Sequence, residues 1–180
     1  MPITDNSTIL NKKYQILRLI GEGGMARVWL AEETSFARRQ VAIKEVRRSA
    51  LSVLDYAELD RRFVQEVELS ARLMAARAPF VVAAYTAERT EDDSLLLVME
   101  YADGGSVADL LRQHPKGMPI AQTLTIVRQV CAALAALHDL PDEPVHRDIK
   151  PSNILLTARG EARLSDFGLA QLPGSIGRSQ

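Results

Sequence analysis

Apolar and polar residues alternate in several short stretches of the chain. In segment 40–46, Val41 and Ile43 fall on one face while Ala42 and Lys44 fall on the other, which predicts a strand. Other runs rich in β-branched and aromatic residues predict further strands, and we expect those of the first half to form an antiparallel sheet. The predicted strands are 14–20, 28–30, 40–46, 81–87, 94–100, 154–157 and 162–165.

Apolar residues at helical spacing take over in three other segments. Segment 58–76 contains no Gly or Pro and predicts one long helix, preceded by a loosely structured connection over 49–57. Ser106 with Asp109 three residues later is typical of the start of a short helix. Segment 123–138 is the clearest helix, and we expect it to be largely buried. Its apolar stripe consists of Ile126, Val130, Leu134 and Leu137.

The composition is that of an ordinary globular chain. With 180 residues, 47% of them hydrophobic and 25% charged, it is large enough for one domain or two small lobes. Its 22 Lys and Arg against 23 Asp and Glu give a net charge of −1, so we expect no nucleic-acid partner. The single Cys131 excludes an internal disulfide and indicates the cytoplasm. We expect no signal peptide and no membrane-spanning segment, since apolar runs such as 95–99 are short.

The glycine-rich turn lies between two predicted strands and contains Gly21, Gly23 and Gly24. Because a strand rather than a helix follows, the turn does not favour a dinucleotide-binding fold. Glycines let the backbone approach a polyphosphate and point N–H groups at its oxygens. The alternative is an ordinary hairpin turn, and the turn alone does not decide between the two.

Lys44 lies inside an apolar strand. An unpaired buried ammonium is costly, so Lys44 either reaches solvent or meets an anion. Glu66 lies near the inward edge of the predicted helix 58–76, where it could pair with Lys44. Glu68 points about 160° away from Glu66, given the advance of about 100° per residue in a helix. The alternative is that both carboxylates are solvated.

Segment 146–153 concentrates chemically active residues. It reads His-Arg-Asp-Ile-Lys-Pro-Ser-Asn, which brings a candidate base, two cations and an amide ligand into one loop. Thirteen residues after Asn153, and beyond a predicted strand pair, stands Asp166-Phe167-Gly168. The carboxylate there can hold a metal, and the glycine lets the chain change direction.

Taken in order, these motifs resemble the eukaryotic-type (Hanks-type) protein serine/threonine kinases, including those of bacteria. The resemblance spans roughly residues 14–170 and includes Val-Ala-Ile-Lys at 41–44. It implies an α+β, two-lobed, protein-kinase-like fold. Residues 1–13 would be an N-terminal extension, 14–100 an N-lobe of antiparallel sheet with one main helix, and 101–180 an incomplete, mainly helical C-lobe.

The resemblance also implies a role for each matching residue. Asp148 would accept the proton of a protein Ser or Thr hydroxyl, and Lys150, in the position typical of serine/threonine kinases, would steady the transferred phosphoryl group. Lys44 would hold the phosphates of ATP and pair with Glu66. The implied Mg²⁺ ligands are Asn153 and Asp166. The implied ATP-binding residues are Ile20, Gly21, Glu22, Gly23, Gly24, Ala26, Val28, Ala42, Lys44, Met99, Glu100, Ala102 and Leu155.

Two features depart from the family pattern. Ala26 stands where a third glycine is usual, and the sequence stops twelve residues after Gly168, so we expect a kinase domain truncated after Asp-Phe-Gly. One alternative is a non-catalytic ATP-binding or interaction fragment, in which the apolar stripe over 126–137 would lack packing partners. Another is a small-molecule phosphotransferase of the aminoglycoside-kinase type, against which Arg147 and Lys150 argue. Nothing in the sequence indicates the oligomeric state.

Overall fold

The protein consists of two compact units. The structure, a computed structural model, describes residues 3–23, 26–35, 38–46, 53–91 and 93–167, without the side chains of 53–56. One unit comprises Met1–Phe63 with Ala83–Tyr101, and the other comprises Val64–Val82 with Ala102–Gln180. The first is built mainly of strands and the second mainly of helices, which confirms the predicted two-lobed α+β fold.

The described residues form eight strands, three α-helices and a short 3-10 helix. The strands are β1 (Thr8–Ile9), β2 (Tyr14–Glu22), β3 (Ala26–Glu33), β4 (Gln40–Val46), β5 (Ala84–Arg89), β6 (Leu95–Glu100), β7 (Ile154–Leu156) and β8 (Ala162–Leu164). The helices are α1 (Val53–Ala75), α2 (Val107–Gln113), α3 (Ile120–His138) and the 3-10 helix Pro151–Asn153.

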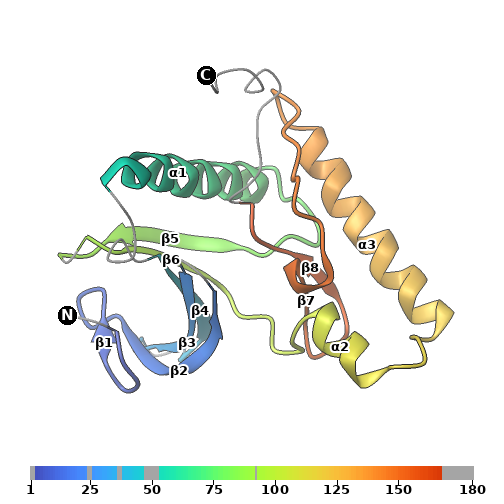
Figure 1. The fold of residues 1–180 in the computed structure, drawn as a ribbon, viewed down its shortest axis with the longest axis horizontal. Helices are drawn as coiled ribbons and strands as arrows, with labels where there is room; N and C mark the ends of the chain where they lie inside the picture. The colour runs from blue at the N-terminus through green and yellow to red at the C-terminus, as the bar shows by residue number, and fades with distance from the viewer. Residues whose placement is uncertain (1–2, 24–25, 36–37, 47–52, 92, 168–180) are drawn as a thin grey trace. The chain divides into compact units, whose positions relative to one another are not determined.

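The first unit contains a six-stranded antiparallel sheet with the strand order β1-β2-β3-β4-β6-β5. Figure 1 shows that this sheet is curled. Alternation places Val41 and Ile43 in its core, where each is 0% exposed, together with Trp29. Trp29 Nε1–H donates a hydrogen bond of 2.9 Å to the buried carboxylate of Glu45. The predicted alternation over β4 is therefore confirmed, and Lys44 lies on the other face.

The residues before β2 belong to the same core. Ile3 is 7% exposed and packs in the cluster that contains Tyr14. The Asn6 N–H donates to the Ile16 carbonyl, and β1 pairs with β2 through Ile9 and Tyr14. No strand was predicted here, because two residues are too short a segment for alternation to be visible.

Several element boundaries differ from the pattern, for example that of β3, which spans Ala26–Glu33 where 28–30 was predicted. Helix α1 begins at Val53, so most of the connection expected to be loosely structured is helical, as suits residues free of Gly and Pro. Strand β5 begins at Ala84, while Val81 forms an isolated bridge with Leu164. Helix α3 begins directly after Pro119, whose fixed φ is compatible with a helix start.

Helix α3 organises the core of the second unit. Its buried residues are Ile126, Val130, Ala133 and Leu137. They join two apolar clusters, one with α2 and the β7–β8 hairpin and one with the second half of α1 and Phe167. The expectation that this stripe would lack packing partners is therefore wrong.

The opposite side of α3 is exposed. Ile120, Leu124 and Val127 are 77%, 56% and 50% exposed, so the expectation of a largely buried helix is also wrong. The reason is that the described elements of this unit cover only one side of it. By length and composition alone α3 would be able to cross a membrane, but the core helix of a water-soluble domain passes the same test, so this is weak evidence.

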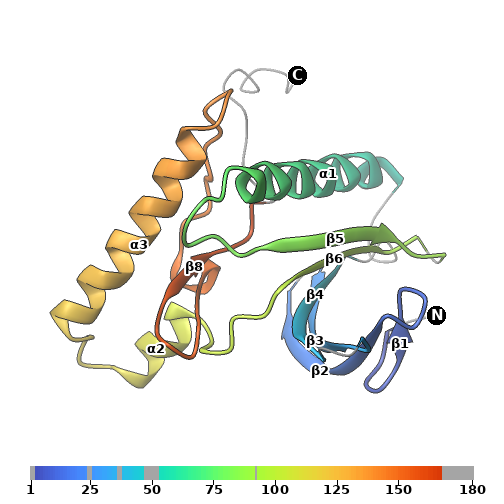
Figure 2. The same ribbon diagram turned by 180° about the vertical axis from the view of Figure 1, so that it is seen from behind.

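Helix α2 packs against the β7–β8 hairpin in the second unit, which Figure 2 shows from behind. The Gly104 N–H donates to the Leu156 carbonyl at 2.7 Å. A Cβ atom on Gly104 would lie 2.5 Å from the Thr157 carbonyl oxygen, so only glycine fits this approach. Ser106 and Asp109 form the capping box that the sequence predicted.

Candidate active site

The glycine-rich turn connects β2 and β3 as a hairpin, as predicted. Gly21 pairs with Val28, and the Gly23 N–H donates to the Ala26 carbonyl at 2.9 Å. A helix does not follow the turn, so the dinucleotide-binding fold is excluded. Ala26 pairs with Val46 in extended β3, a conformation that alanine adopts without strain. Gly24 lies outside the described residues.

A Cβ atom on Gly21 would meet Val28 at an ordinary van der Waals distance of 3.6 Å. The backbone of the hairpin therefore does not itself require glycine at this position. What glycine provides here is the absence of a side chain, which leaves the backbone N–H groups approachable. Next to it, Glu22 forms an ion pair with Arg27 at 2.6 Å, and Ile20 lies half-buried in β2.

Four of the candidate nucleotide-binding residues share one face of the sheet. Val28 is paired with Lys44, and Ala42 is paired with Met99. Directly paired residues of adjacent strands point to the same side, and residues two apart on a strand do so as well. The register therefore brings Val28, Ala42, Lys44 and Met99 together on the face opposite the core.

The end of β6 is bound to the residues before β5. The Glu100 N–H donates to the Ala83 carbonyl at 2.8 Å, and the Ala83 N–H donates to the Glu100 carboxylate at 3.2 Å. Ala102, the first residue of the chain's return to the second unit, is buried. Leu155 lies half-buried in β7 and forms an isolated bridge with Ser106.

Glu66 is 6% exposed, whereas Glu68 is exposed. This agrees with the orientation that helix geometry predicts for the two carboxylates. Glu66 belongs to the second unit and Lys44 to the first, and their pairing stays a prediction.

The loop between α3 and β7 places two polar groups around one carboxylate oxygen. Asp148 Oδ2 accepts a hydrogen bond from Lys150 Nζ at 2.7 Å and another from Asn153 Nδ2 at 2.9 Å. Asn153 Nδ2 also donates to the Asp148 carbonyl at 2.9 Å. Asn153 is 6% exposed, so the amide that holds Asp148 is itself fixed in the interior.

These contacts determine the charge of the loop. The hydrogen bond from Lys150, followed by that from Asn153, holds the pKa of Asp148 below its usual range. The same contact with Asp148 raises the pKa of Lys150. At neutral pH the loop therefore carries an ionised carboxylate with a cation beside it.

The buried ring of His146 holds the loop through contacts of both its nitrogen atoms. It is 1% exposed, its Nδ1 accepts the Asp148 N–H at 3.3 Å, and its Nε2 lies 3.1 Å from the Ser165 carbonyl. An Nδ1 that accepts implies a neutral ring whose Nε2–H donates to Ser165. Burial lowers the pKa of His146, which favours this neutral form. The ring also lies against Phe167, with centroids 5.1 Å apart.

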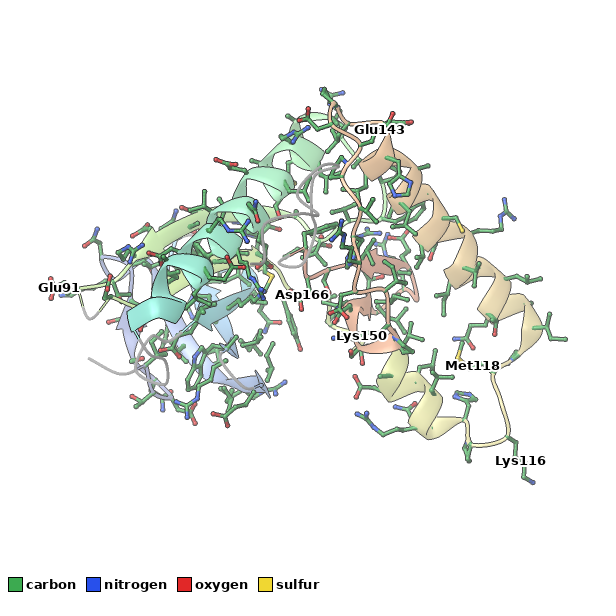
Figure 3. All side chains as sticks on the ribbon, turned by 45° about the horizontal axis from the view of Figure 1, so that its top comes forward. Glu91, Lys116, Met118, Glu143, Lys150 and Asp166 are labelled. Carbon is green, nitrogen blue, oxygen red and sulfur yellow. The ribbon has the colours of Figure 1, made fainter. Side chains whose placement is uncertain are left out.

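The residue before Asp166 ties the two candidate metal ligands together. The Ser165 N–H and Oγ both donate to the Asn153 carbonyl, at 2.9 Å and 3.0 Å. Lys150 precedes β7 and Asp166 follows β8, and both are labelled in Figure 3. Ser165 is not among the residues that the motifs single out, and its only signal in the sequence is a hydroxyl residue directly before Asp166. Gly168 lies outside the described residues.

Two residues of this site adopt left-handed backbone conformations. Arg147 has a φ of 65° and Asp166 a φ of 64°, which is uncommon for residues other than glycine. Such conformations cost free energy and concentrate at functional sites. Among the described residues no three His, Cys, Asp or Glu side chains gather as a metal cluster.

Comparison with known proteins places these features in a family. Residues 14–176 match the model of the protein kinase domain. The chain is 38% identical over 173 residues to the serine/threonine-protein kinase pkn2 of Myxococcus xanthus, with 94% of this chain and 19% of that protein covered. It is 39% identical over 168 residues to PrkC of Bacillus subtilis, with 89% of this chain and 23% of that protein covered.

A third relative, the serine/threonine-protein kinase PknD of Mycobacterium tuberculosis, is 36% identical over 167 residues, with 93% of this chain and 24% of that protein covered. The chain thus spans about a fifth to a quarter of the length of these relatives. The family match covers both units, from the glycine-rich hairpin to the loop that holds Asp148. The chain belongs to the protein kinase family.

Proposed function

We propose that this chain is the catalytic domain of an ATP-dependent protein kinase that phosphorylates serine and threonine. The observation that carries the proposal is the Asp148 carboxylate, held by Lys150 at 2.7 Å and by Asn153 at 2.9 Å. A fixed, ionised carboxylate can accept a hydrogen bond from an incoming hydroxyl group. The names of the relatives, all serine/threonine-protein kinases, support the substrate class.

The proposed reaction is an in-line phosphoryl transfer. The substrate oxygen forms a bond to the γ-phosphorus while the bond to the β-γ bridging oxygen breaks and ADP leaves. The hydroxyl proton passes to Asp148. Because charge spreads over the phosphoryl oxygens in a loose transition state, the cation of Lys150 next to Asp148 stabilises it electrostatically.

The residues fit the Mg²⁺ that the family uses. Asn153 Nδ2 donates to Asp148, which leaves Oδ1 as the acceptor end of the amide, with a long contact of 3.5 Å from Ser152 Oγ. We propose that Asn153 Oδ1 and the Asp166 carboxylate hold the metal, because hard oxygen ligands suit Mg²⁺, which keeps further positions for phosphate and water. When bound, Mg²⁺ neutralises charge on the β- and γ-phosphates.

We assign the nucleotide to the sheet face that carries Lys44. On this proposal Val28 and Ala42 cover the adenine. Met99 directly precedes Glu100, whose backbone binds the adenine. Their common face, given by the register, supports the assignment. The remaining proposed contacts are Ile20, Gly21, Glu22, Gly23, Gly24, Ala26, Glu100, Ala102 and Leu155, with Lys44 on the phosphates and Glu66 as its partner.

We further propose that the domain acts in the cytoplasm as a signalling kinase. Its single cysteine, Cys131, is free and exposed, which suits a reducing compartment. The substrate is a protein that presents a Ser or Thr hydroxyl.

The test is transfer of labelled γ-phosphate to Ser- and Thr-containing proteins. We expect Asp148→Asn to lower the rate at least about 100-fold, since general-base catalysis typically contributes 10²–10⁴. The matched control is Asp139→Asn at an exposed aspartate of the same unit, which we expect to leave the rate unchanged. Equal rates for the two variants would overturn the proposal, and so would label found only on a small molecule such as an aminoglycoside.

A further inference from the structure

One contact of the first unit crosses the strand that we propose binds adenine. The guanidinium of Arg39, directly before β4, lies over the ring of Tyr85 in β5, with 4.0 Å from Cζ to the ring centroid. Strand β6 lies between β4 and β5 in the sheet, so the contact passes over β6. The register places it at the end of β6, because Val41 pairs with Glu100 and Ala84 pairs with Met99.

Tyr85 is the extra residue of a β-bulge. The pairing steps from Ala84 with Met99 to Thr86 with Val98, so two residues of β5 advance against one of β6. A bulge redirects a side chain, and bulges are over-represented next to active sites. Here the redirected side chain is the ring that Arg39 covers.

Arg39 is held from a third strand as well. Its Nη2 lies 3.3 Å from the carboxylate of Glu33 in β3. A planar guanidinium can pair with a carboxylate at its edge while its face stacks on an aromatic ring. Glu33, Arg39 and Tyr85 therefore form a connection from β3 to β5 that covers the last residues of β6.

Glu100, the residue under this connection, is also bound by its side chain to the residue directly before β5. The Glu100 carboxylate accepts the Ala83 N–H at 3.2 Å. The position of the Glu100 backbone is thereby coupled to the strand that carries Tyr85. A change in the Arg39–Tyr85 stack would be transmitted to Glu100 rather than absorbed by a free strand end.

We propose that Arg39 and Tyr85 are positioning residues for the adenine site, which hold the end of β6 where Glu100 presents its backbone to the base. This inference rests on the proposed function. Tyr85 is 37% exposed, and a cation–π contact at an exposed site is of modest strength, so we expect an effect of roughly two- to five-fold on ATP affinity. The aromatic face matters and the hydroxyl does not.

The experiment measures the Kd of Mg-ATP and of Mg-tripolyphosphate, which lacks the base, for the full chain. We expect Arg39→Ala and Tyr85→Leu to raise the Kd of ATP roughly two- to five-fold and to leave the Kd of tripolyphosphate unchanged. Tyr85→Phe keeps the ring and should keep the affinity. The matched control is Arg38→Ala, since Arg38 is 77% exposed and forms a similar ion pair of 3.3 Å with Glu32. Amide exchange at Glu100 in the free protein should be faster in Arg39→Ala.

Each outcome decides a separate point. An ATP affinity of Arg39→Ala equal to that of Arg38→Ala, with unchanged exchange at Glu100, overturns the positioning role and leaves the proposed function intact. An equal loss of both ligands also overturns it, because the effect would then not be specific to the base. A parent protein that binds neither ligand overturns the proposed function and this inference with it.

Discussion

Replacement of Trp29 by phenylalanine tests how β4 is held in the orientation that leaves Lys44 on the face opposite the sheet core. Trp29 and Glu45 are diagonal neighbours on the buried face of the β3–β4 pair, 5% and 3% exposed. The indole N–H donates to the carboxylate at 2.9 Å. Phenylalanine fills much of the same space but leaves this buried carboxylate without its indole donor.

The expected magnitude follows from that geometry. A hydrogen bond to a charged group contributes about 1.5–3 kcal/mol, and loss of one buried partner exposes the desolvation cost of the other. Trp29→Phe should therefore lower the free energy of unfolding by at least about 1.5 kcal/mol. Glu45→Met leaves the indole unpaired in the same way. In the double variant both polar groups are gone, so the two costs should not add.

The assay is urea unfolding of the parent, the two single variants and the double variant, followed by far-UV circular dichroism. Fluorescence is unsuitable because Trp29 is the single tryptophan of the chain. We expect a coupling free energy of about 1.5–3 kcal/mol between the two sites. Additivity within about 0.5 kcal/mol would refute the idea that this hydrogen bond anchors β4.

Two further predictions concern the second unit. Gly104→Ala should lower the free energy of unfolding by about 1–3 kcal/mol, because its Cβ would meet backbone atoms of Leu156 and Thr157. Gly21→Ala, whose Cβ would make ordinary contacts only, is the control. Equal unfolding midpoints of the two variants in urea would contradict the prediction. Burial keeps the pKa of His146 below its ordinary value, so below about pH 6.5 the unfolded state binds the proton more readily and stability should fall as the pH is lowered. His146→Asn should flatten this dependence between about pH 5 and 7, and a slope the same as that of the exposed control His138→Asn would count against it.

The strands and helices that follow a regular period could be predicted from the sequence. In β4, burial of one face imposes alternation on Val41 and Ile43, and in α3 the buried stripe imposes the helical period. Strand β1 could not be predicted, because two residues show no period and the burial of Ile3 in the sheet core is a tertiary contact. The exposed side of α3 could not be predicted either, since burial depends on which elements pack against a helix.

The candidate site, too, could be predicted from the sequence only in part. The residue types of the loop 146–153 and of Asp166 predicted an acid–base and metal chemistry, because such side chains have few other reasons to gather in one loop. The contacts that arrange these side chains belong to the tertiary structure. The two hydrogen bonds from Ser165 to the Asn153 carbonyl and the close approach of Gly104 to Thr157 join distant parts of the chain, and no local pattern encodes them.

The most direct test of the proposed kinase is a crystal structure of the full chain with Mg²⁺ and a non-hydrolysable ATP analogue. We predict a metal ion bound by Asn153 and Asp166, the terminal phosphate facing Asp148, and Lys44 at the inner phosphates. A nucleotide that binds elsewhere, or one that contacts Lys44 while Asp148 and Asp166 surround a different space, would contradict the proposal.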